Sequence, residues 1–252
     1  MRLPVLGGLK AGIRGELFLL DIFAALLPEL DGSVVDVGAN LGQTLVKVKL
    51  ADPKRRYYGF EPNPACFDYL EKLVSANRWS GITLFPVGLS DRTAIARLHA
   101  FSRRATDPKG SLKPEARPDV DPVYTKHVVV FDYAAVDALI DDPIALLKID
   151  VEGSEYEIIA SMQARISRDR PLVVFELMTV PAMEARHQQT IELLGSYGYR
   201  VYRIDRDSGR HWRGLTPLSS YVYAAVPAQS DYLAVPEKRL AMVERLAPQS
   251  SS

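Results

Sequence analysis

The feature that most constrains this sequence is residues 34–42 (VVDVGANLG), a short β-branched run that leads into a turn with two glycines. An apolar-spaced segment, residues 44–50, follows, so the pattern predicts a strand, a tight turn and the start of a helix. Gly38 and Gly42 lack a Cβ atom and would let the backbone approach a ligand. The unpaired N–H groups that open the helix favour an anionic group in the turn.

The spacing of these glycines argues against two common cofactors. A dinucleotide-binding turn reads G-x-G-x-x-G after an apolar strand, whereas three residues separate Gly38 from Gly42, and Asp36 lies within the strand itself. The residues around Gly42 also lack the Gly-Lys-Ser/Thr of an ATP-binding loop. We therefore expect neither NAD nor ATP as the cofactor.

A second predicted strand, residues 56–60, ends at the sequence Glu-Pro-Asn-Pro, residues 61–64. The Glu61 carboxylate at its tip is placed to accept hydrogen bonds from two ribose hydroxyls. S-adenosylmethionine combines a ribose with an amino-acid carboxylate, an amine and a sulfonium. The two stretches together therefore predict S-adenosylmethionine as the cofactor.

Several short motifs, in this order, resemble the FkbM family of S-adenosylmethionine-dependent methyltransferases. They are VDVGANLG (35–42), FEPNP (60–64), GLSD (88–91), KIDVEGSE (148–155), FE (175–176) and DYLAVP (231–236). The resemblance implies an α/β, class I methyltransferase (Rossmann-like) fold, with a mostly parallel seven-stranded sheet, helices on both faces and a reversed last strand. It also implies O-methylation of small molecules or sugars, without naming the acceptor.

The alternation of apolar strands and helical patterns agrees with a mostly parallel sheet. We expect a helical N-terminal extension (residues 1–30, with the helix at 12–30), a methyltransferase domain (31–236) and a C-terminal tail (237–252). The first helix could be a lid on the sheet, a wall of the acceptor site or a homodimer contact. Residues 96–101 and 126–132 suggest a small β-insertion, and 199–205 with 221–227 a closing hairpin.

Residues 102–122 break the pattern, because prolines and charges replace apolar side chains. Loops of this length are usually functional or disordered. The segment is therefore either a flexible insertion or a lid over the acceptor pocket. As a lid, it would offer four basic side chains to an anionic acceptor, namely Arg103, Arg104, Lys109 and Lys113.

The carboxyl ends of parallel strands meet at one crevice, which gathers the candidate site residues. Asp36 could hold the turn or the methionine ammonium, and Ser90 with Asp91 could contact adenine or form a turn. The residues we expect to bind the cofactor are Asp36, Gly38, Asn40, Gly42, Thr44, Glu61, Asn63, Ser90, Asp91 and Asp150.

A second group of carboxylates lies toward the expected acceptor. Asp150, Glu152 and Glu176, with Glu155 in the next helical turn, could raise one another's pKa, and one could act as the general base. Asp150 is the first choice for the base. The same acids could hold Mg²⁺ or Ca²⁺, but no ligand spacing is defined, so we predict no metal site.

The composition of the chain limits which classes of binding partner are expected. The 252 residues contain 31 basic and 31 acidic side chains, so global charge gives no reason to expect nucleic acid. Cys66 is the single cysteine, and residues 17–27 are too short to span a bilayer. We expect a cytoplasmic enzyme whose small-molecule acceptor carries the hydroxyl of a sugar, a polyketide or another secondary metabolite. The alternatives are N-methylation of an amine or peptide, and a non-catalytic nucleoside-binding module.

Overall fold

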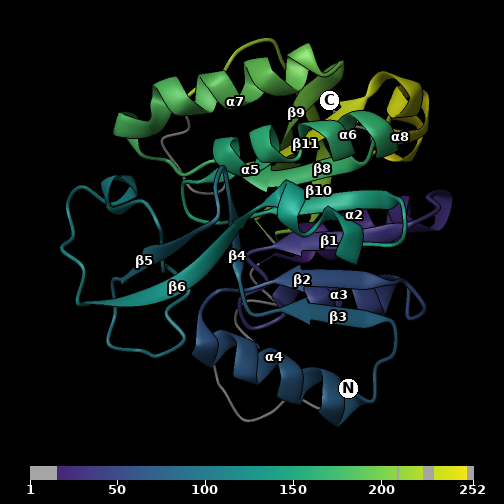
Figure 1. The fold of residues 1–252 in the computed structure, drawn as a ribbon. Coiled ribbons are helices and arrows are strands. Elements are labelled where there is room, and N and C mark those ends of the chain that lie inside the picture. Colours follow the sequence, from purple (N-terminus) through teal and green to yellow (C-terminus); the bar gives the residue numbers. More distant parts are fainter. Residues whose placement is uncertain (1–15, 209, 224–229, 249–252) are drawn as a thin grey trace.

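Parallel strands around residues 33–37 form the centre of the fold. The structure is a computed structural model that describes residues 16–208, 210–223 and 230–248. Within these residues, eight strands make one sheet in the order β10-β9-β11-β8-β7-β1-β2-β3 (Figure 1). The strands are β1 (Ser33–Val37), β2 (Tyr57–Phe60), β3 (Ile82–Phe85), β7 (Ile144–Ile149), β8 (Leu172–Glu176), β9 (Tyr199–Arg206), β10 (Trp212–Leu218) and β11 (Asp231–Pro236).

The strand directions confirm a mostly parallel sheet with a reversed last strand. β1, β2, β3, β7 and β8 are parallel to one another, and β11 lies antiparallel between β8 and β9. The expected count of seven strands and the hairpin at residues 221–227 are wrong, because β9 pairs with β10 and β11 instead. Tyr221–Tyr223 lie outside any strand, and residues 224–229 lie outside the described part of the chain.

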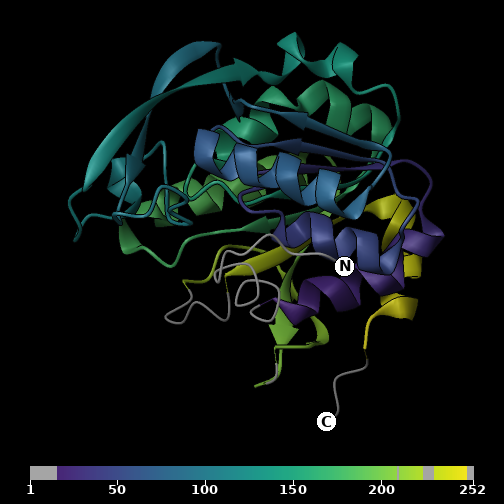
Figure 2. The same cartoon turned by 90° about the horizontal axis from the view of Figure 1, so that it is seen from below.

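Helices cover both faces of the sheet, as expected (Figures 1 and 2). Side-chain alternation along β1 divides the core, since Val34 packs with one helical layer and Val35 with the other. The first layer consists of α2 (Leu17–Leu26), α3 (Gln43–Ala51), α4 (Pro64–Asn77) and α8 (Leu240–Leu246). The second layer consists of α5 (Glu155–Ser161), α6 (Gln163–Asp169) and α7 (Glu184–Ser196).

The N-terminal helix is shorter than expected in the described residues. α2 begins at Leu17 and continues into a 3-10 turn, Leu27–Glu29, while residues 12–15 lie outside the described part. Its apolar side chains are buried in the chain's own core, which includes residues of α3 and α8. Packing within the chain thus accounts for the apolar stripe, and a homodimer contact through this helix stays a prediction.

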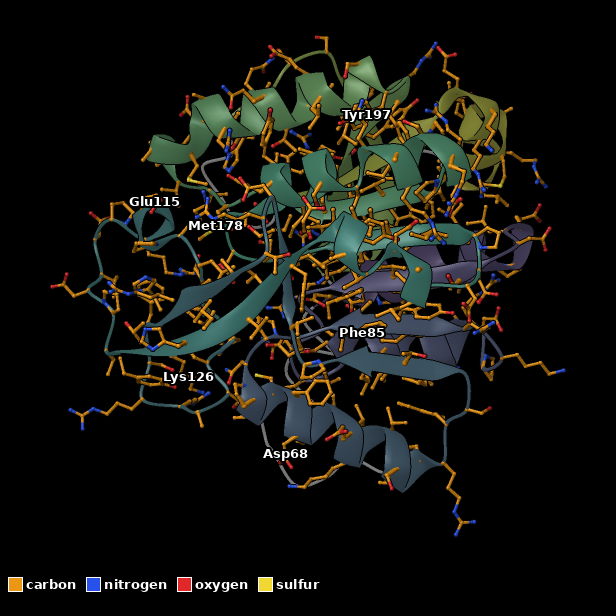
Figure 3. All side chains as sticks on the ribbon, viewed as in Figure 1. Asp68, Phe85, Glu115, Lys126, Met178 and Tyr197 are labelled. Carbon is orange, nitrogen blue, oxygen red and sulfur yellow. The ribbon has the colours of Figure 1, made fainter. Side chains whose placement is uncertain are left out.

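A three-stranded sheet forms the expected β-insertion. It consists of β4 (Gly88–Ser90), β5 (Ala94–Ala100) and β6 (Tyr124–Asp132), with β5 antiparallel to β6. The segment between β5 and β6 folds back on β5 through paired backbone hydrogen bonds between His99 and Ser111. Figure 3 shows Glu115 in this segment and Lys126 on β6 on the same side of the molecule. No helix in the described part of the chain is long and apolar enough to cross a membrane.

Candidate functional site

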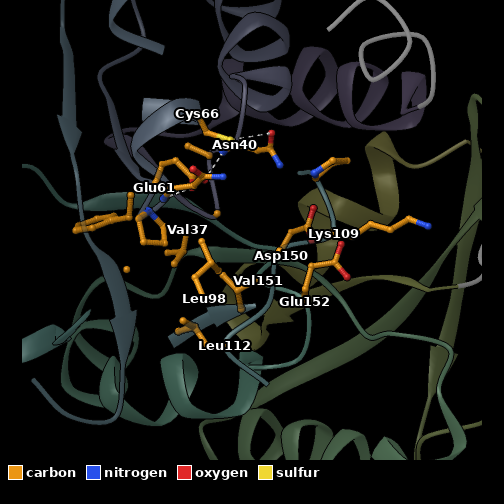
Figure 4. A pocket seen from close by; sticks show the side chains of 18 of the residues that line it. Val37, Asn40, Glu61, Cys66, Leu98, Lys109, Leu112, Asp150, Val151 and Glu152 are labelled. Atoms are coloured by element: carbon orange, nitrogen blue, oxygen red, sulfur yellow. Dashed lines mark hydrogen bonds between the residues drawn. The ribbon is translucent and has the colours of Figure 1, made fainter. Parts of the chain in front are cut away.

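A pocket of about 330 Å³ lies at the carboxyl ends of β1, β2, β7 and β8, where the strand pattern predicts a crevice. Figure 4 shows Glu61 and Asn40 at one end of the pocket and Asp150 and Glu152 at the other. The predicted site residues that line it are Gly38, Asn40, Thr44, Glu61, Asn63, Asp150, Glu152 and Glu176.

Four predicted cofactor residues are not in the pocket wall. Ser90 and Asp91 contact each other on the exposed side of the insertion, and Gly88 and Leu89 of β4 line the pocket in their place. Asp36 is fully buried behind the wall. The fourth, Gly42, directly precedes α3 and packs against α4, where an added Cβ would come within 2.8 Å of Leu73.

Gly38 is required by the chain itself rather than by a ligand. Its φ of +87° lies in the left-handed region, and a Cβ there would stand 1.9 Å from the carbonyl oxygen of Asp150. From the sequence, we explained Gly38 by the close approach of a ligand to the backbone. That explanation is incomplete. Gly38 lines the pocket, but its lack of a side chain lets the β1 turn meet the β7 turn.

Glu61 ties together the turns that follow β1 and β2. Its Oε2 accepts a hydrogen bond of 2.7 Å from the Asn40 N–H, and its Oε1 accepts one of 2.7 Å from the Asn63 N–H. Asn40 has a φ of +47°, so Glu61 holds a turn that few non-glycine residues adopt. Glu61 follows the second strand as expected, but it does not stand in solvent there, because the residue is only 7% exposed.

The protonation of Glu61 reflects this environment. Burial raises its pKa to about 7, although the two amides that donate to it act in the opposite direction. Each carboxylate oxygen has two lone pairs, and each accepts one backbone hydrogen bond. The carboxylate therefore retains acceptor capacity for groups in the pocket.

A lysine that the sequence reasoning missed connects Asp36 to the pocket. Lys148 Nζ lies 2.9 Å from Asp150 Oδ2 and 3.8 Å from Asp36 Oδ1. Burial acts to lower the pKa of Lys148, but Asp150 and Asp36 outweigh it, so the net shift is upward and the ammonium stays charged. Burial raises the pKa of Asp36, while Lys148 and the Tyr57 hydroxyl, which donates to its Oδ2 at 2.5 Å, lower it. The sequence feature that could have identified Lys148 is a lysine within a strand of otherwise apolar residues.

The other end of the pocket is acidic. Burial and the nearby Asp150 raise the pKa of Glu152 to about 7, although its Oε2 lies 2.6 Å from Arg117 Nη2. The same two causes raise the pKa of Glu176 well above its usual range, and Ser230 Oγ donates to its Oε1 at 2.9 Å. A raised pKa makes each of these carboxylates a stronger base.

Asp231 was recognised only as part of a motif, yet it lies beside this group. It faces Glu176 across the β8–β11 pair and forms an ion pair of 2.7 Å with Arg206. Burial raises its pKa to about 7 against the effect of Arg206. Strand pairing, which single motifs do not reveal, places it there.

The segment between β5 and β6 forms one wall of the pocket. Lys109, Leu112 and Arg117 are among its residues in the wall. The other basic residues proposed for an anionic acceptor lie elsewhere, since Arg103 and Arg104 are exposed outside the lining and Lys113 pairs with Glu157 at 3.0 Å. Closure of this segment over a ligand stays a prediction.

Glu155 holds a turn and does not line the pocket. Its Oε1 accepts hydrogen bonds from the N–H groups of Val151 and Gly153, at 3.3 and 3.0 Å. Burial raises its pKa to about 7, against the opposing effect of the turn amides. The expectation that Glu155 lies with the acids near the acceptor is therefore wrong.

Replacing Glu155 with glutamine should flatten the pH dependence of stability. Because its native pKa is raised, Glu155 stabilises the native state below pH 4.5, and this contribution is lost as the pH rises to about 7. Glu155→Gln keeps the acceptor oxygen but cannot ionise. Between pH 4.5 and 7, the unfolding free energy of the wild type should therefore fall by about 3 kcal/mol more than that of the variant. Urea denaturation measures this, with exposed Glu71→Gln as the control, and equal pH slopes would contradict it.

Among the described residues, no group of histidine, cysteine or acidic side chains has the arrangement of a metal site.

Comparison with known proteins identifies relatives of the chain. A family model described as "Methyltransferase FkbM domain" matches residues 36–201, more than half of the sequence. "Methyltransferase 1" of Beauveria bassiana (strain ARSEF 2860) is 26% identical over 165 residues, which cover 60% of this chain and 66% of that protein. "Methyltransferase sdnD" of Sordaria araneosa is 29% identical over 153 residues, which cover 50% and 58%. The matches therefore span less than two thirds of either relative.

A solved structure, methyltransferase FkbM from Methylobacillus flagellatus KT, is also similar. Its sequence is 18% identical, its TM-score is 0.49, and the match covers 81% of this chain and 43% of that one.

Proposed function

The chain belongs to the FkbM methyltransferase family, and from this premise we propose that it is an S-adenosylmethionine-dependent methyltransferase that acts on a hydroxyl group of a small molecule. The observation that carries the proposal is the two-ended pocket. A carboxylate tied to two backbone amides lies at one end, acidic side chains lie at the other, and apolar residues such as Val37 and Leu98 lie between them (Figure 4).

The residues of the first end fit the donor. Glu61 would hold the ribose hydroxyls with the lone pairs that its backbone partners leave, and the turn at Gly38 to Asn40, with Thr44, would hold the amino-acid carboxylate. Leu89 and Pro62 offer an apolar surface to the adenine in place of Ser90 and Asp91. When bound, the donor supplies a methyl group on a cationic sulfur.

The second end supplies the groups that would orient and deprotonate the acceptor. Asp150 already accepts a hydrogen bond from the Lys148 ammonium, so we assign it to binding a cation. Glu176 and Glu152 line the pocket, and burial raises the pKa of both, so we place the general base at Glu176 with Glu152 as second choice. Such a base contributes roughly 10²–10⁴-fold.

The charge of the wall favours a neutral acceptor. Six carboxylic residues line the pocket, against three basic ones, and two of the basic side chains are paired with Asp150 and Glu152. The lining therefore leaves little positive charge for an anionic acceptor, whereas its carboxyl groups can hydrogen-bond the hydroxyls of a neutral one. The same acidic wall would accept a cationic amine, which keeps N-methylation as the second candidate.

Methyl transfer to matched acceptors tests the proposal. We expect transfer from radiolabelled S-adenosylmethionine to neutral polyols such as simple sugars, with little or none to their phosphate esters. The variant Glu176→Gln should lower kcat for a hydroxyl acceptor by about 100-fold, with little change in donor affinity. Preferred turnover of amines would favour the second candidate, and donor binding without turnover on any acceptor would indicate a binding module.

A further inference from the structure

Lys148 lies between two carboxylates and hydrogen-bonds only one of them. Its Nζ is 2.9 Å from Asp150 Oδ2, at the pocket, and 3.8 Å from Asp36 Oδ1, behind the wall. Asp36 Oδ1 is buried and has no hydrogen-bond partner among the described residues, whereas Oδ2 accepts from Tyr57. Thr44 also faces this carboxylate. A buried acceptor without a partner is costly, and a short movement of Lys148 would satisfy it.

We propose that Lys148 is a two-position residue that leaves Asp150 for Asp36 when the ammonium group of the donor arrives, so that Asp150 is free to bind that ammonium. This inference rests on the proposed function. Lys148 is then a positioning residue: it pairs with Asp150 while the site is empty and moves to Asp36 when a second cation enters.

The electrostatics of the site support such an exchange. Lys148 and a ligand ammonium on one carboxylate would repel each other at close range, and the repulsion is strong in a buried site. Asp36 offers Lys148 an alternative counter-ion, and closing 3.8 Å to a normal hydrogen bond takes a shift of about 1 Å. Lys47, which also has Asp36 as a charged neighbour, cannot replace it, since its Nζ is held by Glu16 at 2.5 Å.

Two ligands that differ in the amino-acid part separate this exchange from a structural effect. S-adenosylhomocysteine carries the ammonium, whereas 5′-methylthioadenosine has the same nucleoside without it. In Asp36→Asn, Lys148 loses its anionic alternative and stays on Asp150. Affinity for S-adenosylhomocysteine should then fall about tenfold, while affinity for 5′-methylthioadenosine stays within about twofold.

The double variant Asp36→Asn/Lys148→Met supplies the rescue. It removes the lysine together with its buried counter-ion, so Asp150 can bind the ammonium without competition. The ratio of the two affinities should return to the wild-type value or exceed it, which loss of structure would not produce. Calorimetry gives both affinities, and an unchanged ratio in Asp36→Asn, or no recovery in the double variant, would overturn the inference.

A crystal structure of the wild-type protein with S-adenosylhomocysteine decides the matter if the variants do not fold. Lys148 Nζ should then lie within hydrogen-bond distance of Asp36 Oδ1, and the ligand ammonium should lie on Asp150. Lys148 still bonded to Asp150 in that complex would overturn the inference alone. If the wild type binds neither nucleoside, the proposed function itself is wrong.

Discussion

Gly38→Ala is expected to cost about 4 kcal/mol or more of unfolding free energy and to leave little folded protein at physiological temperature. Two causes act together. The backbone has a φ of +87°, which alanine adopts with strain, and the new Cβ would lie 1.9 Å from the carbonyl oxygen of Asp150. That oxygen belongs to the backbone and cannot rotate away, so the turns after β1 and β7 would have to separate.

Gly195→Ala is the matched control for this prediction. Gly195 lies in α7, and a Cβ there would meet nothing within 4 Å. Alanine should therefore stabilise the protein by about 0.5–1 kcal/mol through helix propensity. Urea denaturation of both variants provides the comparison, and a Gly38→Ala protein as stable as the wild type would show that the two turns are not in contact.

Glu61→Ala is expected to weaken S-adenosylhomocysteine binding by about 100-fold or more. A carboxylate that holds two ribose hydroxyls contributes two charge-assisted hydrogen bonds, each worth about 1.5–3 kcal/mol. The substitution should also lower the unfolding free energy by about 2 kcal/mol, because the amides of Asn40 and Asn63 lose their acceptor. Glu61 thus has both a binding and a structural role.

Calorimetry well below the midpoint of thermal unfolding separates these two effects. Glu71→Ala removes an exposed acid from α4 and should leave both affinity and stability within error of the wild type. If Glu61→Ala is destabilised but binds S-adenosylhomocysteine as tightly as the wild type, Glu61 is a structural residue only, and the ribose must bind elsewhere.

Local patterns predicted the fold well where one element determines its own structure. The β-branched run before Gly38 and the apolar spacing after it gave β1 and α3 within one or two residues. β10 escaped prediction because Gly214 and Pro217 interrupt its pattern. Proline is tolerated there because β10 is an edge strand, and edge position depends on the whole sheet.

The candidate site was predictable where it follows from strand ends. Gly38, Glu61 and Asp150 follow β1, β2 and β7, so the topology of parallel strands brought them together. Ser90 and Asp91 do not obey this rule. The chain leaves the large sheet at Phe85, and β4 pairs with β6 in the insertion, so the carboxyl end of β4 faces a different environment.

Local sequence patterns missed residues whose roles depend on the side chains that they pair with in the fold. Lys148 acquires its role from Asp36 and Asp150, and Arg117 acquires its role from Glu152. Arg117 precedes Pro118 in a segment without periodicity, so no local pattern placed it at the pocket. The lysine in the buried strand β7 did carry a signal, because a buried charge requires a counter-ion.

Titration of the wild-type protein with S-adenosylhomocysteine tests the central claim most directly. The claim is that the pocket between Glu61 and Asp150 is a binding site for an adenosyl donor. Calorimetry should show a single site with a dissociation constant of about 10 μM or tighter, and no heat of binding with NAD. Absence of S-adenosylhomocysteine binding, or binding of NAD in its place, would contradict the account.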